Sequence, residues 1–395
     1  MSAYDFDHVD EAALRGSLSS KWNRHDPDVL PAWVADMDFR VAPAIDAAVW
    51  SIAESGLHLY PRWSTYEDVK LAYAERSRKR WGIEVDPSLV FVVSEVVQAM
   101  QAATLAFSEP GDGVLILTPI YPPFLAVPRD QQRPVVEHRM VGHDDKYTFD
   151  YEVLRAQVEA ARPKVFLLCN PHNPVGRVFT HAELSALRDL VVEFDMVCVA
   201  DEIHSDLVFE PHRHIPFASL GPDVAARTIT LTSASKAFNL AGLRCSVMGF
   251  GATSLKERFE TVIPEAVLGK PSSMGMIATV AAWRESEDWL DACLVHLDGN
   301  RQYLLSELAR RLPMVGCPKP EGTYLAWLDF GGAVGARFAG SVGERLREEG
   351  RVALNEGPTF GAGLEAWARL NFATSRPILA RVVDRIEAWV AEQPS

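Results

Sequence analysis

The sequence is poor in several features that would each mark a specialised class of protein. Its 395 residues include only five cysteines, and no two of them form a CxxC pair. It has no low-complexity tract and no long internal repeat. No uninterrupted apolar stretch is long enough to cross a bilayer. We therefore expect neither a disulfide framework nor a zinc site, and the pair His212 and His214, in a predicted loop, is not expected to bind a metal.

Basic residues are outnumbered as well. The chain has 39 lysines and arginines against 53 aspartates and glutamates, which gives a formal net charge of -14. Nucleic-acid binding needs a concentrated basic face, so no nucleic-acid partner is expected. The first residues combine neither a basic segment nor an apolar leader. Together with cysteines that are expected to stay reduced, these features predict a cytoplasmic protein with no membrane partner.

The middle of the chain alternates short apolar runs with amphipathic stretches, as in an α/β domain with a largely parallel sheet. Between two of these runs, Thr180 and Glu183 match the capping box that opens a helix, which predicts a βαβ unit. Runs rich in β-branched or aliphatic residues predict six strands, at 90–93, 113–117, 164–170, 196–201, 228–233 and 245–250.

The pattern of apolar and polar residues changes after about residue 275. Longer helical stretches follow, then the strand-like run TYLAWLDF and a final helix opened by Ser375 and Pro377. We therefore expect three parts. Residues 1–45 would form an N-terminal segment that packs with the small domain, residues 46–275 a large domain, and residues 276–395 a smaller α+β domain.

Several predicted strands are followed by polar or aromatic residues. In open α/β sheets, ligands bind beyond the carboxyl ends of the strands, so these residues are candidates for a site. Tyr121 and Asn173 lie in turns stiffened by prolines. Asp201 ends a strongly apolar run, where an ionised carboxylate needs a cationic or proton-donating partner. Taken singly, each residue also fits an ordinary turn, helix N-cap or ion pair.

The segment TSASKAFNLAGLR, residues 232–244, adds Lys236 at the end of another predicted strand and before a helix-like stretch at 238–243. A surface lysine explains neither the flanking hydroxyls of Ser233 and Ser235 nor Arg244. An amine beside phosphate-binding groups has the parts for a Schiff base with pyridoxal phosphate (PLP). Asp201 would then keep the pyridine nitrogen protonated, which makes the ring an electron sink.

These residues belong to motifs that resemble those of the fold-type I PLP-dependent enzymes, the aminotransferase class I/II superfamily. NPHNPVG, ADEIHSDL, SASKAFNLAGLR and WARLNFATSR occur in the superfamily's order and spacing. KWNRHDPDVLPAWVADMDF, TPIYPPF and PEGTYLAWLDF resemble the cystathionine β-lyase (C-S β-lyase) branch more narrowly. The resemblance, over residues 20–385, implies an α/β fold with a mostly parallel seven-stranded sheet in the large domain and a smaller α+β domain.

The resemblance also implies a PLP site. Lys236 would hold the cofactor and remove the proton from the substrate's Cα. Asp201 would pair with the pyridine nitrogen, and Asn173 would hydrogen-bond the phenolic oxygen of the ring. Tyr121 would stack on the ring, and His204 belongs to the same cofactor-binding set. The phosphate would be held by Ser233, Ser235, Arg244, the backbone N–H groups near Val96 and Val97, and Tyr60 of the partner subunit.

A small amino acid is the substrate that the resemblance implies. Arg369 would receive its α-carboxylate in a bidentate pairing that lysine could not imitate. The chain around Ala35 and Asp36 would close over the substrate, with Asn173 and Tyr60 beside it. Because the resembled site is completed by two subunits, the resemblance also implies a homodimer with shared active sites.

The residue at position 204 helps to choose the reaction. Typical aminotransferases of the superfamily carry tyrosine here, whereas this chain has His204, as the lyase branch does. We therefore expect β-elimination: Lys236 removes the Cα proton, a thiolate leaves Cβ, and hydrolysis yields pyruvate and ammonia. From cystathionine the thiol would be homocysteine, a step of methionine biosynthesis. An aminotransferase on the same scaffold and a non-catalytic regulator with this fold are the alternatives.

Three places depart from the lyase branch. Glu95 stands where a glycine usually precedes the phosphate-contacting valines, and a carboxylate beside a phosphate is repulsive unless it points away. Leu59 replaces the glycine before Tyr60, and serines in KPSSMGMIA replace an asparagine. Because these positions border the expected substrate pocket, the preferred substrate could differ from cystathionine.

Overall fold

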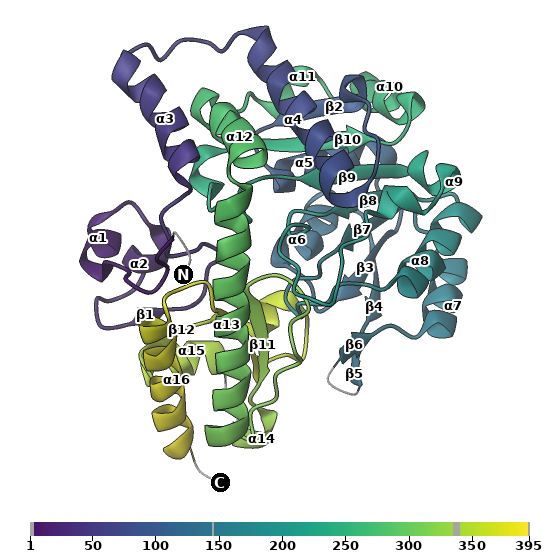
Figure 1. Cartoon of the computed structure of the whole chain (residues 1–395). Helices are drawn as coiled ribbons and strands as arrows, with labels where there is room; N and C mark the ends of the chain where they lie inside the picture. The colour runs from purple at the N-terminus through teal and green to yellow at the C-terminus, as the bar shows by residue number, and fades with distance from the viewer. Residues whose placement is uncertain (1–3, 144–145, 335–339, 394–395) are drawn as a thin grey trace.

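A seven-stranded sheet lies at the centre of the structure, a computed structural model that describes residues 4–143, 146–334 and 340–393 (Figure 1). Its strands lie side by side in the order β2, β10, β9, β8, β7, β3 and β4. All six predicted strands are confirmed to within one residue, and β4 completes the sheet. They are β2 (Val90–Val93), β3 (Val114–Thr118), β4 (Val135–Arg139), β7 (Val165–Cys169), β8 (Val197–Asp201), β9 (Thr228–Thr232) and β10 (Ser246–Phe250).

Only β10 runs against the common direction of this sheet. Strands β4, β3, β7, β8 and β9 pair in parallel, whereas β10 is antiparallel to both β9 and β2. The expectation of a mostly parallel sheet is therefore confirmed. One consequence decides where the site lies: the amino end of β10 meets the carboxyl ends of the other six strands at one edge.

Helices cover both faces of the sheet, which explains why its strands are continuous apolar runs. Ile116 of β3 packs in one apolar cluster with α5, whereas its neighbours Leu115 and Leu117 pack in another with α7 and α8. The surrounding helices are α3 (Pro43–Ser55), α4 (Trp63–Trp81), α5 (Val96–Phe107), α6 (Pro122–Asp130), α7 (Tyr151–Ala161), α8 (His181–Glu193), α9 (Pro222–Ala225), α10 (Thr253–Val262), α11 (Glu265–Leu268) and α12 (Ser273–Glu285).

The capping box predicted at Thr180 and Glu183 is present and opens α8. The Thr180 hydroxyl accepts a hydrogen bond from the Glu183 N–H, and the Glu183 carboxylate accepts one from the Thr180 N–H. Two of the four N–H groups that a helix start leaves without partners are satisfied in this way. No helix in the described part of the chain combines the length and the apolar content that crossing a membrane needs.

A second, smaller sheet lies beside the long helix α13 (Figure 1). Its strands β11, β14 and β13 are antiparallel, and the final helix begins after Ser375 as predicted. The expected boundary at residue 275 falls inside α12, and the division into three parts stays a prediction. The elements here are α13 (Glu287–Arg311), β11 (Leu325–Asp329), α14 (Gly331–Val334), α15 (Val342–Glu348), β12 (Val352–Ala353), β13 (Asn355–Glu356), β14 (Trp367–Asn371) and α16 (Arg376–Ala391).

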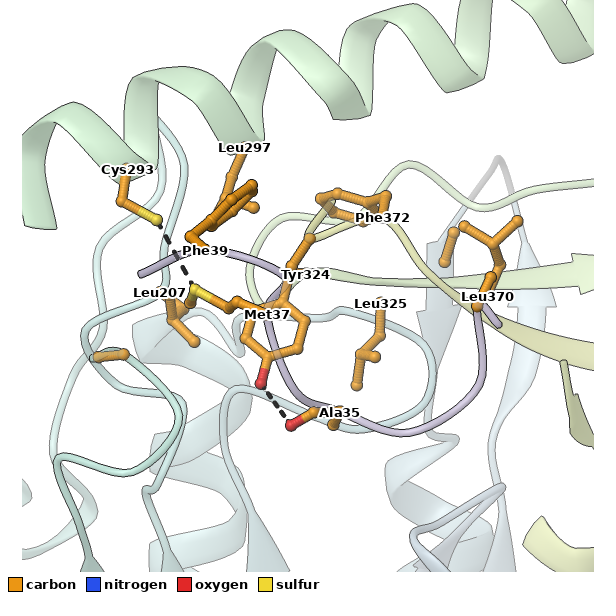
Figure 2. Packing of buried hydrophobic residues seen from close by; sticks show 14 of the residues in the cluster. Ala35, Met37, Phe39, Leu207, Cys293, Leu297, Tyr324, Leu325, Leu370 and Phe372 are labelled. Atoms are coloured by element: carbon orange, nitrogen blue, oxygen red, sulfur yellow. Dashed lines mark hydrogen bonds between the residues drawn. The ribbon is translucent and has the colours of Figure 1, made fainter. Parts of the chain in front are cut away.

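The N-terminal segment is tied to both sheets. It contains α1 (Glu11–Gly16), α2 (Ser20–Asn23) and β1 (Leu30–Pro31), and β1 pairs in parallel with β12 beside the small sheet. Further along, Met37 and Phe39 pack against Tyr324 and the inner side of α13 (Figure 2). These contacts carry the backbone around residue 35 across the edge where the large sheet's strands end.

Polar contacts hold this backbone in place. The ammonium of Lys21 forms a buried ion pair with Asp38, with 2.9 Å between Nζ and Oδ2. The Trp22 ring N–H donates to the other carboxylate oxygen of Asp38 at 2.7 Å. The side-chain amide of Asn371, at the end of β14, donates to the carbonyls of Val34 and Asp36 at 2.6 and 2.7 Å. The segment is therefore fixed by side chains as well as by its apolar packing.

The prediction of a helix-like stretch at 238–243 is wrong. A turn is followed by a short 3₁₀ helix at Ala241–Leu243. Asn239 has a positive φ of 59°. Its side-chain amide forms hydrogen bonds with the backbone of the N-terminal segment. It accepts from the Met37 N–H and donates to the carbonyls of Met37 and Phe39. These tertiary hydrogen bonds outweigh the local helical pattern.

The buried ion pair gives a test of how the N-terminal segment is held. In an Asp38→Asn variant the Lys21 ammonium stays buried without an anion, and we expect the free energy of unfolding to fall by about 3–5 kcal/mol. A Lys21→Met, Asp38→Asn double variant removes both charges and should lose less. Urea unfolding compares the three proteins. Equal losses in the single and double variants would contradict a stabilising role for the pair.

Candidate active site

Lys236 lies in the turn after β9, where its amine meets the N-terminal segment. The Nζ atom donates to the Ala35 carbonyl at 2.8 Å. The buried hydroxyl of Tyr324 donates to the same carbonyl at 2.7 Å (Figure 2). Burial lowers the pKa of the Lys236 amine, although the carboxylates of Asp36 and Asp201 oppose the shift. An amine with a lowered pKa is more readily available as a nucleophile and as a base.

Asp201 is the last residue of β8 and is buried at the same edge. Burial raises the pKa of its carboxyl to about 7, and the charge of Glu202 adds to the shift. The Ile203 N–H, 3.1 Å away, and the Lys236 charge oppose it. Within the described residues, no basic side chain forms an ion pair with Asp201. Glu202 itself is bound by the ring of His214 at 3.2 Å, so the predicted loop histidine is buried against a carboxylate.

Arg369, on β14, reaches the same edge and is 3% exposed. Its two terminal nitrogens donate to the side chains of Asn173 (2.9 Å) and Asn355 (2.5 Å) and to the Trp33 carbonyl (3.1 Å). Burial lowers the pKa of the guanidinium to about 10. Its Nε atom has no hydrogen-bond partner, and no carboxylate pairs with it, among the residues that the structure describes. The charge is therefore oriented but not neutralised, with the Phe360 ring 5.1 Å away.

His204 and Tyr121 face the same group of charges. Burial lowers the pKa of the His204 imidazole to about 3, and the nearby charges of Lys236 and Arg369 add to this effect. Its ring lies edge-on to that of Tyr324, with 6.0 Å between centroids. Tyr121 precedes α6 and is half-buried, and burial raises the pKa of its phenol. Its backbone N–H donates to the Asn173 carbonyl at 3.1 Å.

The residues predicted to hold a phosphate lie at two chain segments of this edge. The Ser233 hydroxyl accepts from the Ser235 N–H at 3.0 Å and donates to the Cys245 carbonyl at 2.7 Å. Val96 and Val97 begin α5, whose first N–H groups are free of helical partners. The guanidinium of Arg244 is paired with the carboxylate of Glu95. Glu95 therefore points toward the predicted phosphate-binding arginine and not away from it.

Tyr60 is the one predicted residue that the chain does not bring into this group. It is fully exposed in the connection between α3 and α4. The same connection carries Leu57 and Leu59, which are also exposed. A role for Tyr60 therefore requires a second copy of the chain.

Sequence reasoning missed the residues that orient the predicted ones. Tyr324 shares the Ala35 carbonyl with Lys236, Asn355 holds Arg369, and Asn371 holds the segment around Asp36. Tyr324 and Asn371 stand inside the motifs PEGTYLAWLDF and WARLNFATSR, so the motifs were the available signal. Their partners are hundreds of positions away in the chain, and no local pattern predicts such contacts.

Residues 34–386 match the family model of the class I and II aminotransferases. The chain belongs to this family. It is 34% identical to the cystathionine β-lyase PatB of Bacillus subtilis over 94% of this chain and 97% of that protein. A solved structure described as a putative PLP-dependent β-cystathionase of Corynebacterium diphtheriae has a TM-score of 0.91 and 32% identity, and covers 99% of this chain and 100% of that chain. A PLP-bound putative aminotransferase of Clostridium difficile has a TM-score of 0.90 and 30% identity, and covers 98% and 100%. The expected fold-type I architecture is thereby confirmed.

The raised pKa of Asp201 gives a test of its desolvation. Between about pH 4 and 7 the folded protein binds a proton that the unfolded chain has released, so its stability falls as the pH rises through this window. The pH-dependence should be weaker in Asp201→Asn. Between pH 5 and 8, the cofactor-free wild-type protein should lose about 2–3 kcal/mol more unfolding free energy than the variant. Urea titrations at both pH values measure this difference, and equal losses would refute the assignment.

Proposed function

We propose that this protein is a PLP-dependent carbon–sulfur β-lyase that cleaves L-cystathionine or a related cysteine S-conjugate. The observation that carries the proposal is the meeting of Lys236, Asp201 and Arg369 at one edge of the sheet. They supply an amine with a lowered pKa, together with a buried carboxylate and a buried guanidinium that form no ion pair among the residues that the structure describes. The named relatives, a cystathionine β-lyase and a β-cystathionase, support the reaction class.

The donors and acceptors at this edge fit PLP. Asp201 is suited to the protonated ring nitrogen, because a cation would relieve the cost of burying its charge. Asn173 is suited to the phenolic oxygen, Tyr121 to a ring face, and Lys236 to the aldehyde carbon. When bound, PLP withdraws electrons from the substrate's Cα and makes its proton acidic. The phosphate would lie among Ser233, Ser235, Arg244, the N–H groups at Val96 and Val97, and Tyr60 of the partner subunit. His204 belongs to the cofactor-binding residues of the same chain.

Arg369 binds the α-carboxylate of the amino-acid substrate in this proposal. Its guanidinium is already oriented by Asn173 and Asn355, so little conformational freedom is lost when the substrate pairs with it. The backbone at Ala35 and Asp36 covers the substrate on the other side. Lys236 takes the proton from Cα, and a thiolate leaves Cβ with its electron pair. Addition of one water completes the conversion to pyruvate, ammonia and a thiol, which is homocysteine when the substrate is cystathionine.

An aminotransferase is the second candidate, because one of the solved structures similar to this chain is described as a putative aminotransferase. Both reactions begin with removal of the Cα proton and differ in what happens next. The neutral His204, in place of the tyrosine of typical aminotransferases, favours the lyase. The two candidates differ in one requirement, since only transamination needs a keto acid as acceptor.

The lyase proposal is tested by incubating the PLP-loaded protein with L-cystathionine and no keto acid. We expect pyruvate and free thiol in equal amounts. Lys236→Ala should reduce the rate on the order of a thousandfold or more, because Lys236 is the group proposed to move the Cα proton. Lys256→Ala, which removes a lysine paired with Glu260 on α10, serves as the matched control.

No release by the wild-type protein, combined with amino transfer once a keto acid is added, would replace the lyase with the aminotransferase. Full activity of Lys236→Ala would contradict a catalytic role for this lysine. In that case a non-catalytic regulator becomes the better account of the fold.

We also infer a homodimer with shared active sites. Large apolar side chains are exposed on α3, on α4 and in their connection: Trp50, Leu57, Leu59, Tyr60 and Trp63. Apolar groups clustered in this way are typical of an interface that a second subunit covers. Covering this surface would also bring Tyr60 next to another chain, as the shared site requires.

A single charge on this surface should separate the subunits. We expect the wild-type protein to sediment as a dimer and Leu59→Asp to shift toward the monomer with reduced lyase activity. Leu18→Asp, at an exposed leucine between α1 and α2, is the control and should leave the dimer intact. A monomeric wild-type protein with full activity would refute the shared site.

A cytoplasmic location also belongs to the proposal. Four cysteines, Cys169, Cys198, Cys245 and Cys293, are buried thiols, which fits a reducing compartment. The net charge of -14 fits a small-molecule substrate better than a nucleic acid or an anionic membrane surface.

A further inference from the structure

The pair formed by Glu95 and Arg244 lies where the cofactor's phosphate is expected. One guanidinium nitrogen of Arg244 is hydrogen-bonded to a carboxylate oxygen of Glu95. Both side chains are partly exposed, Arg244 by 60% and Glu95 by 46%. In the proposed function, Arg244 is the cation that binds the phosphate. The consequence of its pairing with Glu95 therefore rests on that function.

The register of the sheet places these two residues together. Strands β2 and β10 are antiparallel, with Val93 opposite Ser246. Continuing this register by two positions beyond each strand brings Glu95 opposite Arg244. Arg244 has a positive φ of 56° directly after the 3₁₀ helix, so its backbone is held in a specific turn. The two residues are thus placed next to each other by the adjoining ends of two paired strands.

The carboxylate of Glu95 is also turned away from the other anion-binding group nearby. Glu95 is the N-cap of α5, a helix of twelve residues, but its side chain accepts no capping hydrogen bond. An acidic side chain at a helix start ordinarily satisfies one of the free N–H groups there. Here the carboxylate forms an ion pair with Arg244 instead. The N–H groups at Val96 and Val97 therefore stay available to bind another anion.

We propose that Glu95 is an internal anion that competes with the phosphate of PLP for Arg244 and so lowers the affinity of the protein for its cofactor. A phosphate that binds Arg244 must displace the carboxylate, which then stays close to a doubly charged group. The displacement of the carboxylate and its repulsion of the phosphate both weaken the binding of PLP. Both effects are absent when the carboxylate is removed. Because the pair is partly exposed, solvent screening keeps the effect moderate.

The test compares the dissociation constants of PLP for the cofactor-free wild-type, Glu95→Gln and Glu95→Gly proteins, measured by equilibrium titration of the cofactor's absorbance. We expect Kd to fall by about three- to tenfold in both variants. Pyridoxal, which lacks the phosphate, should bind all three proteins with the same Kd. Glu265→Gln is the matched control, because it removes a nearby carboxylate that pairs with Lys270 instead.

An unchanged Kd for PLP in Glu95→Gln would overturn the inference. Equal tightening for PLP and pyridoxal would also overturn it, because the effect would then not involve the phosphate. If the wild-type protein binds PLP in either of these outcomes, the assignment of PLP as the cofactor still holds. If no variant binds PLP, the proposed function fails together with the inference, so the two failures are distinguishable.

Discussion

The common direction of the central strands is the constraint on which the rest of this structure depends. Since six strands end at one edge and only β10 begins there, every turn that leaves or enters the sheet at this edge contributes to one small region. Tyr121, Asn173, Asp201 and Lys236 lie at the ends of four different strands and meet at this edge, where Arg244 precedes β10. The reversed strand matters as much as the parallel ones. A parallel β10 would carry Arg244 to the opposite edge.

The site that results contains charged groups that form no ion pair within the described part of the chain. Asp201, Lys236 and Arg369 all have pKa values shifted toward their neutral forms by burial. Leaving such groups without ionic partners costs stability, and a ligand with matching charges recovers it. Neighbouring parts of the structure hold these groups in place. Tyr324 and Asn371 lie at the small sheet, and the N-terminal segment provides the carbonyl that accepts hydrogen bonds from both Lys236 and Tyr324. Orientation by these neighbours is what turns buried charges into a preorganised site.

The proposed phosphate end of the site differs in character from the proposed substrate end. Around Lys236 and Arg369 the groups are buried and held by several hydrogen bonds. Around Arg244 they are partly exposed, and a carboxylate of the chain itself occupies the guanidinium. In the proposed binding mode the two ends therefore contribute differently: binding at one relieves desolvated charges, whereas binding at the other exchanges one anion for another.

Local patterns in the sequence were sufficient for every strand of the large sheet except β4, for the capping box of α8 and for the residues that follow the strands. Apolar runs, N-cap chemistry and motifs are all written in neighbouring positions. They were sufficient also for the family, since its motifs cover most of the chain. Only the tertiary structure decided the direction of β10, the turn at 238–243 and the supporting side chains Tyr324, Asn355 and Asn371. It also decided that Glu95 faces Arg244. The physical reason is that these features depend on contacts between separate strands and turns, most of them distant in sequence, and such contacts exist only after the sheets have brought the segments together.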